Sequence, residues 1–205
     1  MTATLPTTAP ATPSPVDRRL LLAGAVGAPL WGVVALTQAA LRSDFDFSTQ
    51  PLSLLSTGTL GWVQIANFVV GGVLTVLGGV GLRRTAPEDP WLGRLTAGYG
   101  LGFVAAGVLV MDPVGSVGLT WHAVGHLLTG TLAFVALAAA CLVLAARFRR
   151  EGRAGRAAVS VAAAASVVAG NAWAMTGGAL GSMTLGFGVL AAMVWLSVVI
   201  GRAGR

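Results

Sequence analysis

The feature that most constrains this chain is a series of long apolar stretches separated by short clusters of arginine. An α-helix rises about 1.5 Å per residue, so about 20 apolar residues cross the roughly 30 Å of hydrocarbon in a membrane. Charged residues make up only 10% of the 205 residues, against about 25% in a typical soluble domain. This excludes a water-soluble globule. Stretches long enough to cross a membrane cover residues 20–41, 61–82, 95–111, 121–146, 157–177 and 181–200.

These stretches are continuously apolar, whereas strands of a membrane barrel alternate between apolar and polar residues. The sequence therefore predicts an all-α bundle of six transmembrane helices within a single membrane domain, residues 18–205. Residues 1–17 are rich in Thr, Pro and Ala and offer little to bury, which predicts a disordered cytoplasmic tail.

A twin-arginine export signal is an alternative interpretation of Asp17-Arg18-Arg19 and the leucines that follow. The apolar stretch behind it is longer than a usual signal core, and no small-residue cleavage site precedes Arg42. We therefore expect a retained helix.

The arginines predict the orientation of the bundle. Every basic residue of the chain is an arginine, and all but Arg42 lie in the tail, in the second and fourth connections, or after the last span. Cytoplasmic loops carry the excess of basic residues, so we expect both termini in the cytoplasm. The predicted location is the cell membrane, as a multi-pass protein of the bacterial inner (plasma) membrane.

The net charge of +6 would suggest nucleic acid in a soluble chain. Clusters of arginine beside membrane spans instead indicate contact with anionic lipid headgroups, so we expect no nucleic-acid partner. One cysteine, Cys141, excludes an internal disulfide and a zinc site made of cysteines. The predicted lipid contacts are Arg147, Arg149, Arg150, Arg153 and Arg156.

Strong polar groups gather in what this orientation makes the outer half of the membrane. Polar groups at membrane depth are costly and usually face a bundle interior or a wet cavity. One interpretation is a polar cavity open to the outside; the other is a hydrogen-bond network that binds nothing. The candidate residues of the spans are Gln64, Asn67, Asp112, His122, His126 and Asn171.

The first external loop adds four candidates: Asp44, Asp46, Ser53 and Ser56. Pro51 favours the start of a short helix, which would place the two serines on one face. Such a segment could fold over the cavity as a lid, or it could be an ordinary solvated loop.

A family resemblance covers roughly residues 18–200. Two groups of residues carry it. The first is Pro51-Leu-Ser-Leu-Leu-Ser-Thr-Gly58, Gly61-Trp62, Gln64 and Asn67-Phe68, and the second is Gly107, Asp112-Pro113 and His122. They resemble the signatures of the domain of unknown function 998, a family of uncharacterised bacterial and archaeal membrane proteins. The resemblance implies a bundle of about six spans. It implies no activity, cofactor or site residue.

Two chemistries fit the candidate residues. His122 and His126 lie one helical turn apart and, with Asp112, could hold a zinc ion, which could activate water against a lipid ester or amide. The residue types are similar to those of alkaline-ceramidase and progestin-receptor-like membrane hydrolases. Haem is disfavoured because both histidines share one helix face.

Alternatively, the cavity binds or passes a small polar molecule or a lipid headgroup without catalysis. We favour this binding role over an enzyme. The ligand, the oligomeric state and the presence of a metal are left open by the sequence.

Overall fold

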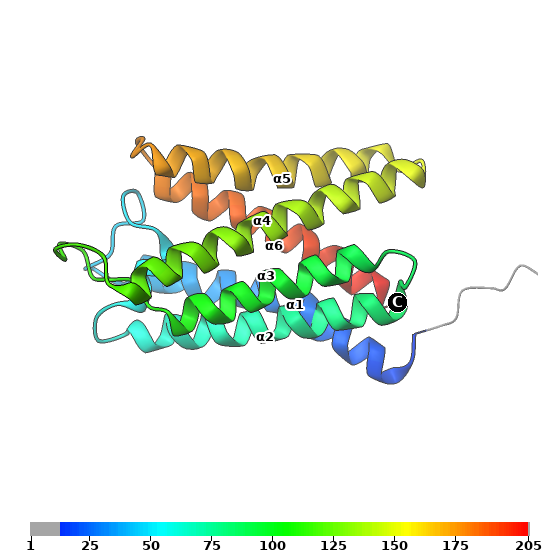
Figure 1. Cartoon of the computed structure of the whole chain (residues 1–205), viewed down its shortest axis with the longest axis horizontal. Coiled ribbons are helices and arrows are strands. Elements are labelled where there is room, and N and C mark those ends of the chain that lie inside the picture. The colour runs from blue at the N-terminus through cyan, green and yellow to red at the C-terminus, as the bar shows by residue number, and fades with distance from the viewer. Residues whose placement is uncertain (1–12, 205) are drawn as a thin grey trace, which may run out of the picture.

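The computed structural model describes residues 13–204, which form six long helices and one short 3-10 helix. The all-α prediction is confirmed (Figure 1). In chain order the elements are α1 (Pro15–Leu41), η1 (Leu52–Ser56), α2 (Gly61–Thr85), α3 (Pro90–Val108), α4 (Trp121–Arg150), α5 (Ala154–Met175) and α6 (Gly181–Ala203).

Helix α1 begins within the segment that we expected to be a tail. Ser14 caps it: its hydroxyl accepts from the backbone N–H of Asp17 at 3.2 Å, and the Asp17 carboxylate accepts from the backbone N–H of Ser14 at 3.3 Å. This reciprocal pair satisfies free backbone donors at the helix start, and Pro15 has the backbone angle that a first turn needs. Residues 1–12 of the predicted tail lie outside the described residues.

Five of the six helices are long and apolar enough to cross a membrane; α3 is not among them. Glycines, Pro90 and Arg94 lower the hydropathy of α3. It also starts and ends earlier than the predicted stretch 95–111, because Pro90 opens the first turn and Leu109 leaves helical backbone angles. Asp112 therefore lies in the loop after α3.

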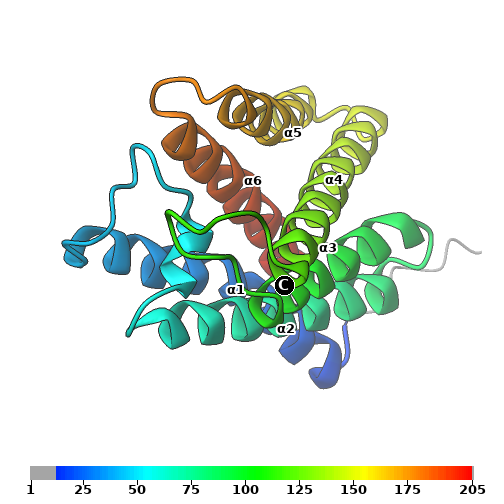
Figure 2. The same ribbon diagram turned by 60° about the vertical axis from the view of Figure 1, so that its left-hand side comes forward.

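The helices form a closed ring. Each packs against the next in the chain, and α6 packs back against α1 (Figures 1 and 2). The closing contact includes a hydrogen bond from the hydroxyl of Ser197 to the carbonyl of Gly24 at 3.3 Å. The loops 42–60, 109–120 and 176–180 meet at one end of this ring (Figure 1).

Glycines let α2 approach both of its neighbours. A Cβ at Gly72 would lie 2.7 Å from the carbonyl oxygen of Gly100 on α3, and one at Gly78 would lie 2.6 Å from the Cα of Gly24 on α1. Lipid does not drive helices together as water does, so membrane helices associate through such close backbone contact. The α1–α2–α3 side is therefore tightly packed.

Candidate functional site

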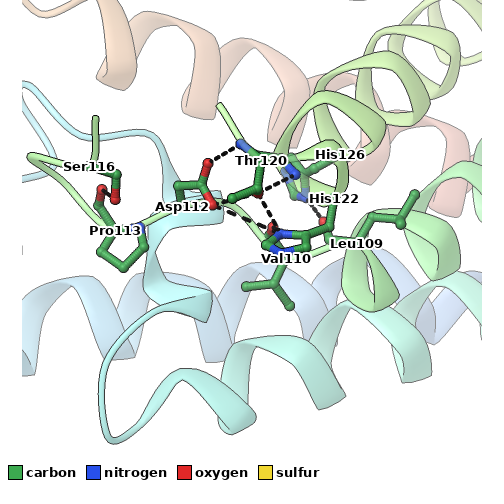
Figure 3. A network of polar contacts seen from close by, with 9 residues as sticks. Leu109, Val110, Asp112, Pro113, Ser116, Thr120, His122 and His126 are labelled. Carbon is green, nitrogen blue, oxygen red and sulfur yellow. Dashed lines mark hydrogen bonds and ion pairs between the residues drawn. The ribbon is translucent and has the colours of Figure 1, made fainter. Parts of the chain in front are cut away.

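Asp112 closes the loop between α3 and α4 (Figure 3). Its carboxylate accepts from the backbone N–H of Thr120 at 2.8 Å and from the Thr120 hydroxyl at 2.7 Å. These two hydrogen bonds, with a smaller contribution from nearby His122, hold the pKa of Asp112 below its usual range. Since Thr120 is the N-cap of α4, Asp112 ties the preceding loop to the start of that helix.

His122 extends this network. Its Nδ1 lies 3.2 Å from the carbonyl oxygen of Val110 and 2.8 Å from the hydroxyl oxygen of Thr120. A carbonyl oxygen only accepts, and the Thr120 proton is given to Asp112, so His122 Nδ1 carries a proton and donates. We name Asp112, Thr120 and His122 the loop bracket, because every bond described here fastens the 109–120 loop.

His126 lies one turn deeper and is 6% exposed. Its Nδ1 lies 2.8 Å from the carbonyl oxygens of both Ala106 and Leu109. These carbonyls belong to the end of α3, where helices leave acceptors without an internal partner. His126 therefore donates from Nδ1 and caps α3 from the neighbouring helix.

The zinc site predicted from these residues is not assembled. His122 Nδ1 is 3.9 Å from the Asp112 carboxylate, and His126 Nδ1 is bonded to other groups. Within residues 13–204, no group of three His, Cys, Asp or Glu side chains is placed to hold a metal ion. Spacing along a helix does not reveal which backbone acceptors compete for each ring nitrogen.

Gln64 and Asn67 form a second network, which joins α2 to α1. The Gln64 carbonyl accepts from the Gln38 amide at 2.8 Å and from the Asn67 amide at 3.2 Å. Asn67 also donates to the backbone carbonyl of Trp31 at 3.0 Å. Gln64 is fully buried, so these bonds offset the cost of placing amides inside the bundle. We name Gln38, Gln64 and Asn67 the amide chain.

The first loop is organised by Arg42, a role that the sequence analysis missed. Its side chain is only 8% exposed and forms a two-pronged pair with Asp44, with a shortest distance of 2.7 Å. It also donates to the carbonyl oxygens of Leu55 at 2.8 Å and Thr57 at 3.2 Å. Arg42 thus fixes η1 against the end of α1, and its hydrogen bonds lower the pKa of Asp44.

The other three loop candidates differ in their surroundings. Asp46 accepts from the hydroxyl and backbone N–H of Ser48, which lower its pKa, and remains exposed. Pro51 does precede a short helix, η1, as predicted. Within it the Ser56 hydroxyl donates to the carbonyl of Ser53 at 2.6 Å.

A cavity of about 200 Å³ lies at the same end of the ring, between η1 and the helices. Of the ten predicted site residues, it is lined by Ser53, His126 and Asn171, while the loop bracket and the amide chain lie outside its lining. The wall of this cavity is mainly apolar. Those predicted residues that do not line it are Asp44, Asp46, Ser56, Gln64, Asn67, Asp112 and His122.

Aromatic rings form one wall of the cavity. Trp31, Phe68 and Phe103 have centroids 5.3 to 5.6 Å apart, and Phe68 meets the ring of His126 edge to face at 6.0 Å. Trp31 is 4% exposed, and its indole N–H has no hydrogen-bond partner in the described part of the chain.

The cavity reaches the side of the bundle between α4 and α5. Its lining includes Leu127 of α4 and Met175 of α5, which are 46% and 79% exposed. Figure 2 shows α4 diverging from α5 toward this end. The exposed lining residues are those that would face hydrocarbon in a membrane.

At the opposite end, the arginines at the end of α4 and the start of α5 surround a single carboxylate. Arg147 and Arg153 each lie 2.9 Å from Glu151, and the bond from Arg147 is the main cause of the lowered pKa of Glu151. Arg156 lies over the ring of Phe148 at 5.8 Å. Arg149 and Arg150 are exposed and form no ion pair with any residue of the range 13–204.

The fold and these surfaces define the class of protein: a helical bundle with several apolar helices, as in multi-pass membrane proteins. The chain belongs to the family described as "Protein of unknown function (DUF998)", whose sequence pattern matches residues 25–202. No curated protein and no protein of solved structure has a significant match to it.

Proposed function

We propose that the chain crosses the cell membrane six times, with both termini in the cytoplasm and the cavity in the outer half. The arginine distribution supports this orientation, because Arg42 is the only arginine in the loops at the cavity end. Helix α3 supplies the sixth crossing: its 19 residues extend about 28 Å, and it packs between α2 and α4.

Cysteine labelling tests this orientation in a Cys141→Ala background. Ser116 lies in the 109–120 loop and Ala154 at the start of α5, and both are exposed. A membrane-impermeant maleimide added to intact cells should label Ser116→Cys and spare Ala154→Cys until the cells are broken. Labelling of both from outside would contradict the proposed topology.

We propose that the protein binds a membrane-dissolved, mainly apolar molecule in the cavity. The observation that carries this proposal is an apolar cavity whose lining includes side chains exposed on the outside of the helices. At about 200 Å³ it is smaller than the roughly 300–1,000 Å³ of a drug-sized site. It therefore takes one part of a ligand, while the remainder lies in the membrane.

Two glycines provide a matched test. Gly130 lines the cavity, Gly98 lies on the exposed side of α3, and a Cβ at either would meet no described atom within 4 Å. Gly130→Leu should fill the cavity, and native mass spectrometry should show loss of lipid-like species that copurify with the wild type. Gly98→Leu should retain them. Equal retention by both variants would refute the binding role.

We propose a structural role for the loop bracket and the amide chain. Their hydrogen bonds join helix ends and neighbouring helices, as in the alternative of a network that binds nothing. No contact among the described residues favours the metal-dependent hydrolase.

We further propose that the arginines at the end of α4 and the start of α5 contact anionic headgroups. Arg149 and Arg150 carry this role best because both are exposed, whereas Arg147 and Arg153 share Glu151. Arg149→Gln with Arg150→Gln should weaken copurification of anionic lipid, measured against Arg94→Gln as a control. Unchanged lipid content would argue against the contact.

A further inference from the structure

A groove of about 350 Å³ follows the outer side of the seam between α1 and α6. Ala25 and Pro29 of α1 form one side, and Val194, Val198 and Gly201 of α6 form the other. Pro29, Val194 and Val198 are exposed. The groove shares no lining residue with the cavity, so it is a separate feature that faces hydrocarbon when the chain lies in a membrane.

Small residues leave this seam unfilled. A Cβ at Gly201 would lie 3.2 Å from the Cβ of Ala25 and would meet no other described atom within 4 Å. Ser197 also lines the groove, and its hydroxyl donates to the carbonyl of Gly24 at 3.3 Å. Because this hydroxyl already has a partner, the body of the groove suits an apolar occupant such as an acyl chain.

Arginines flank one end of the groove. Arg202 lines it and is exposed. Arg18 precedes Ala25 by seven residues, about two helical turns, so it projects from the same face of α1. A Cβ at Gly204 would lie 3.4 Å from the Cβ of Leu21, which places the end of α6 beside the start of α1. One arginine from each helix therefore stands at the same end of the groove.

Both arginines are available to an external anion. Neither Arg18 nor Arg202 forms an ion pair with a residue of the range 13–204. The neighbouring carboxylate of Asp17 is instead paired with Arg84 of α2 at 2.7 Å. Guanidinium groups bind phosphate through paired hydrogen bonds. A choline or ethanolamine headgroup would add a cation that the arginines repel, whereas an anionic phospholipid brings no such charge.

We infer that the groove between α1 and α6 binds one anionic phospholipid from the leaflet that faces the arginines. Its phosphate lies between Arg18 and Arg202, and one acyl chain follows Val198 toward Val194. These valines and Arg202 span eight residues, about 12 Å along α6, so the part of the chain nearest the headgroup is held. The inference rests on the proposed membrane insertion, but neither on the cavity nor on the orientation.

Two photoreactive lipids test the inference with the full chain in phosphatidylcholine nanodiscs, which expose both leaflets. One is phosphatidylglycerol and the other phosphatidylcholine, each with the same diazirine in its acyl chain. Mass spectrometry of peptides should show that phosphatidylglycerol labels residues 22–29 and 194–202 at least about fivefold more strongly, the effect of one arginine near an anionic lipid. Labelling around Val161 and Val168, exposed on α5, is the reference for lipid that contacts the bundle without selection.

A pair of double variants tests the headgroup contact at equal net charge. Arg18→Gln with Arg202→Gln should abolish the preference for phosphatidylglycerol. Arg83→Gln with Arg94→Gln should keep it, since both arginines are exposed but belong to α2 and α3. A preference that survives the first pair would refute the assigned arginines. A preference lost in both pairs would assign the selection to overall charge and overturn the site.

Filling the groove tests the chain contact. Val198 is 39% exposed, so Val198→Trp should occupy the groove and reduce its labelling by both lipids, whereas Val135→Trp, at a 61% exposed position on α4, should not. Equal labelling of the wild type by the two lipids would overturn the anionic selection. Labelling no stronger than that of α5 would overturn the lipid site, and pairs of chains in native mass spectra would then assign the groove to a second copy. The Gly130→Leu result on the cavity changes none of these outcomes.

Discussion

Glycines have opposite effects at the α2–α3 contact and on the α4–α6 side of the same bundle. At Gly72 and Gly100 the absent side chains let two backbones meet, and nothing else fits. At Gly130 the absent side chain leaves open space that belongs to the cavity. A glycine within a membrane helix therefore either allows close backbone contact with a neighbouring helix or leaves open space. The position of the neighbouring helix determines which of the two occurs.

The largest expected effect comes from filling the contact. Gly72→Leu places a side chain against the backbone of Gly100 and Val104 on α3, so it should lower the free energy of unfolding by about 3 kcal/mol. Gly130→Leu should change it by less than about 0.5 kcal/mol, because its side chain enters open space. Denaturant unfolding in detergent measures both. Equal destabilisation by the two substitutions would remove the proposed difference between the regions.

Two asparagines test the same contrast with hydrogen bonds. Asn67→Leu removes the bonds to Trp31 and Gln64 and should cost about 1 kcal/mol, a typical value for hydrogen bonds between membrane helices. Asn171→Leu, on the cavity wall, should change stability by less than about 0.5 kcal/mol. The same unfolding assay applies. A larger loss for Asn171 than for Asn67 would mean that the cavity side, too, depends on polar contacts.

The connection between α5 and α6 provides a smaller effect of opposite sign. Leu180 has φ of 59°, in the left-handed region, and is 55% exposed. A side chain in this region costs about 1–2 kcal/mol, but glycine loses more entropy on folding. Leu180→Gly should therefore stabilise the protein by about 0.5 kcal/mol. A decrease in the midpoint of thermal unfolding would show that Leu180 contributes packing that outweighs its backbone strain.

The smallest effect concerns the loop bracket and depends on pH. The bonds from Thr120 lower the pKa of Asp112 in the folded protein, so its contribution is fully present above the unfolded pKa of about 3.9. That contribution is lost as the pH falls through the lower, folded pKa. Asp112→Asn should flatten the fall in thermal stability below about pH 4. Parallel profiles for the two proteins would assign this fall to other carboxylates.

The sequence located the helices along the chain well, but it did not reveal which partners the polar side chains contact. Arginine clusters and apolar lengths located all six helices, and Pro51 located η1. Depth alone suggested that His122, His126 and Asp112 meet at one site. Their ring nitrogens and carboxylate are instead bonded to Val110, Ala106, Leu109 and Thr120, partners set by how α3 ends.

The cavity was harder to predict because apolar residues form most of its wall. Trp31, Phe68 and Phe103 come from three helices, and nothing in their local sequence distinguishes an aromatic that lines a cavity from one that fills a core. Arg42 shows the converse. Its isolation on one side was used to orient the bundle, yet its fork-shaped side chain also organises the loop that contributes Leu52 and Ser53 to the cavity.

The packing of α6 against α1 has a consequence for how the protein is made. The ribosome completes α1 long before α6, so the surface around Gly24 that later receives Ser197 is uncovered throughout synthesis of the intervening helices. During that interval α2 already packs against α1 at the neighbouring Gly78. The tight α1–α2 contact would then act as a scaffold early in biogenesis, and the ring would close only with the arrival of its last helix.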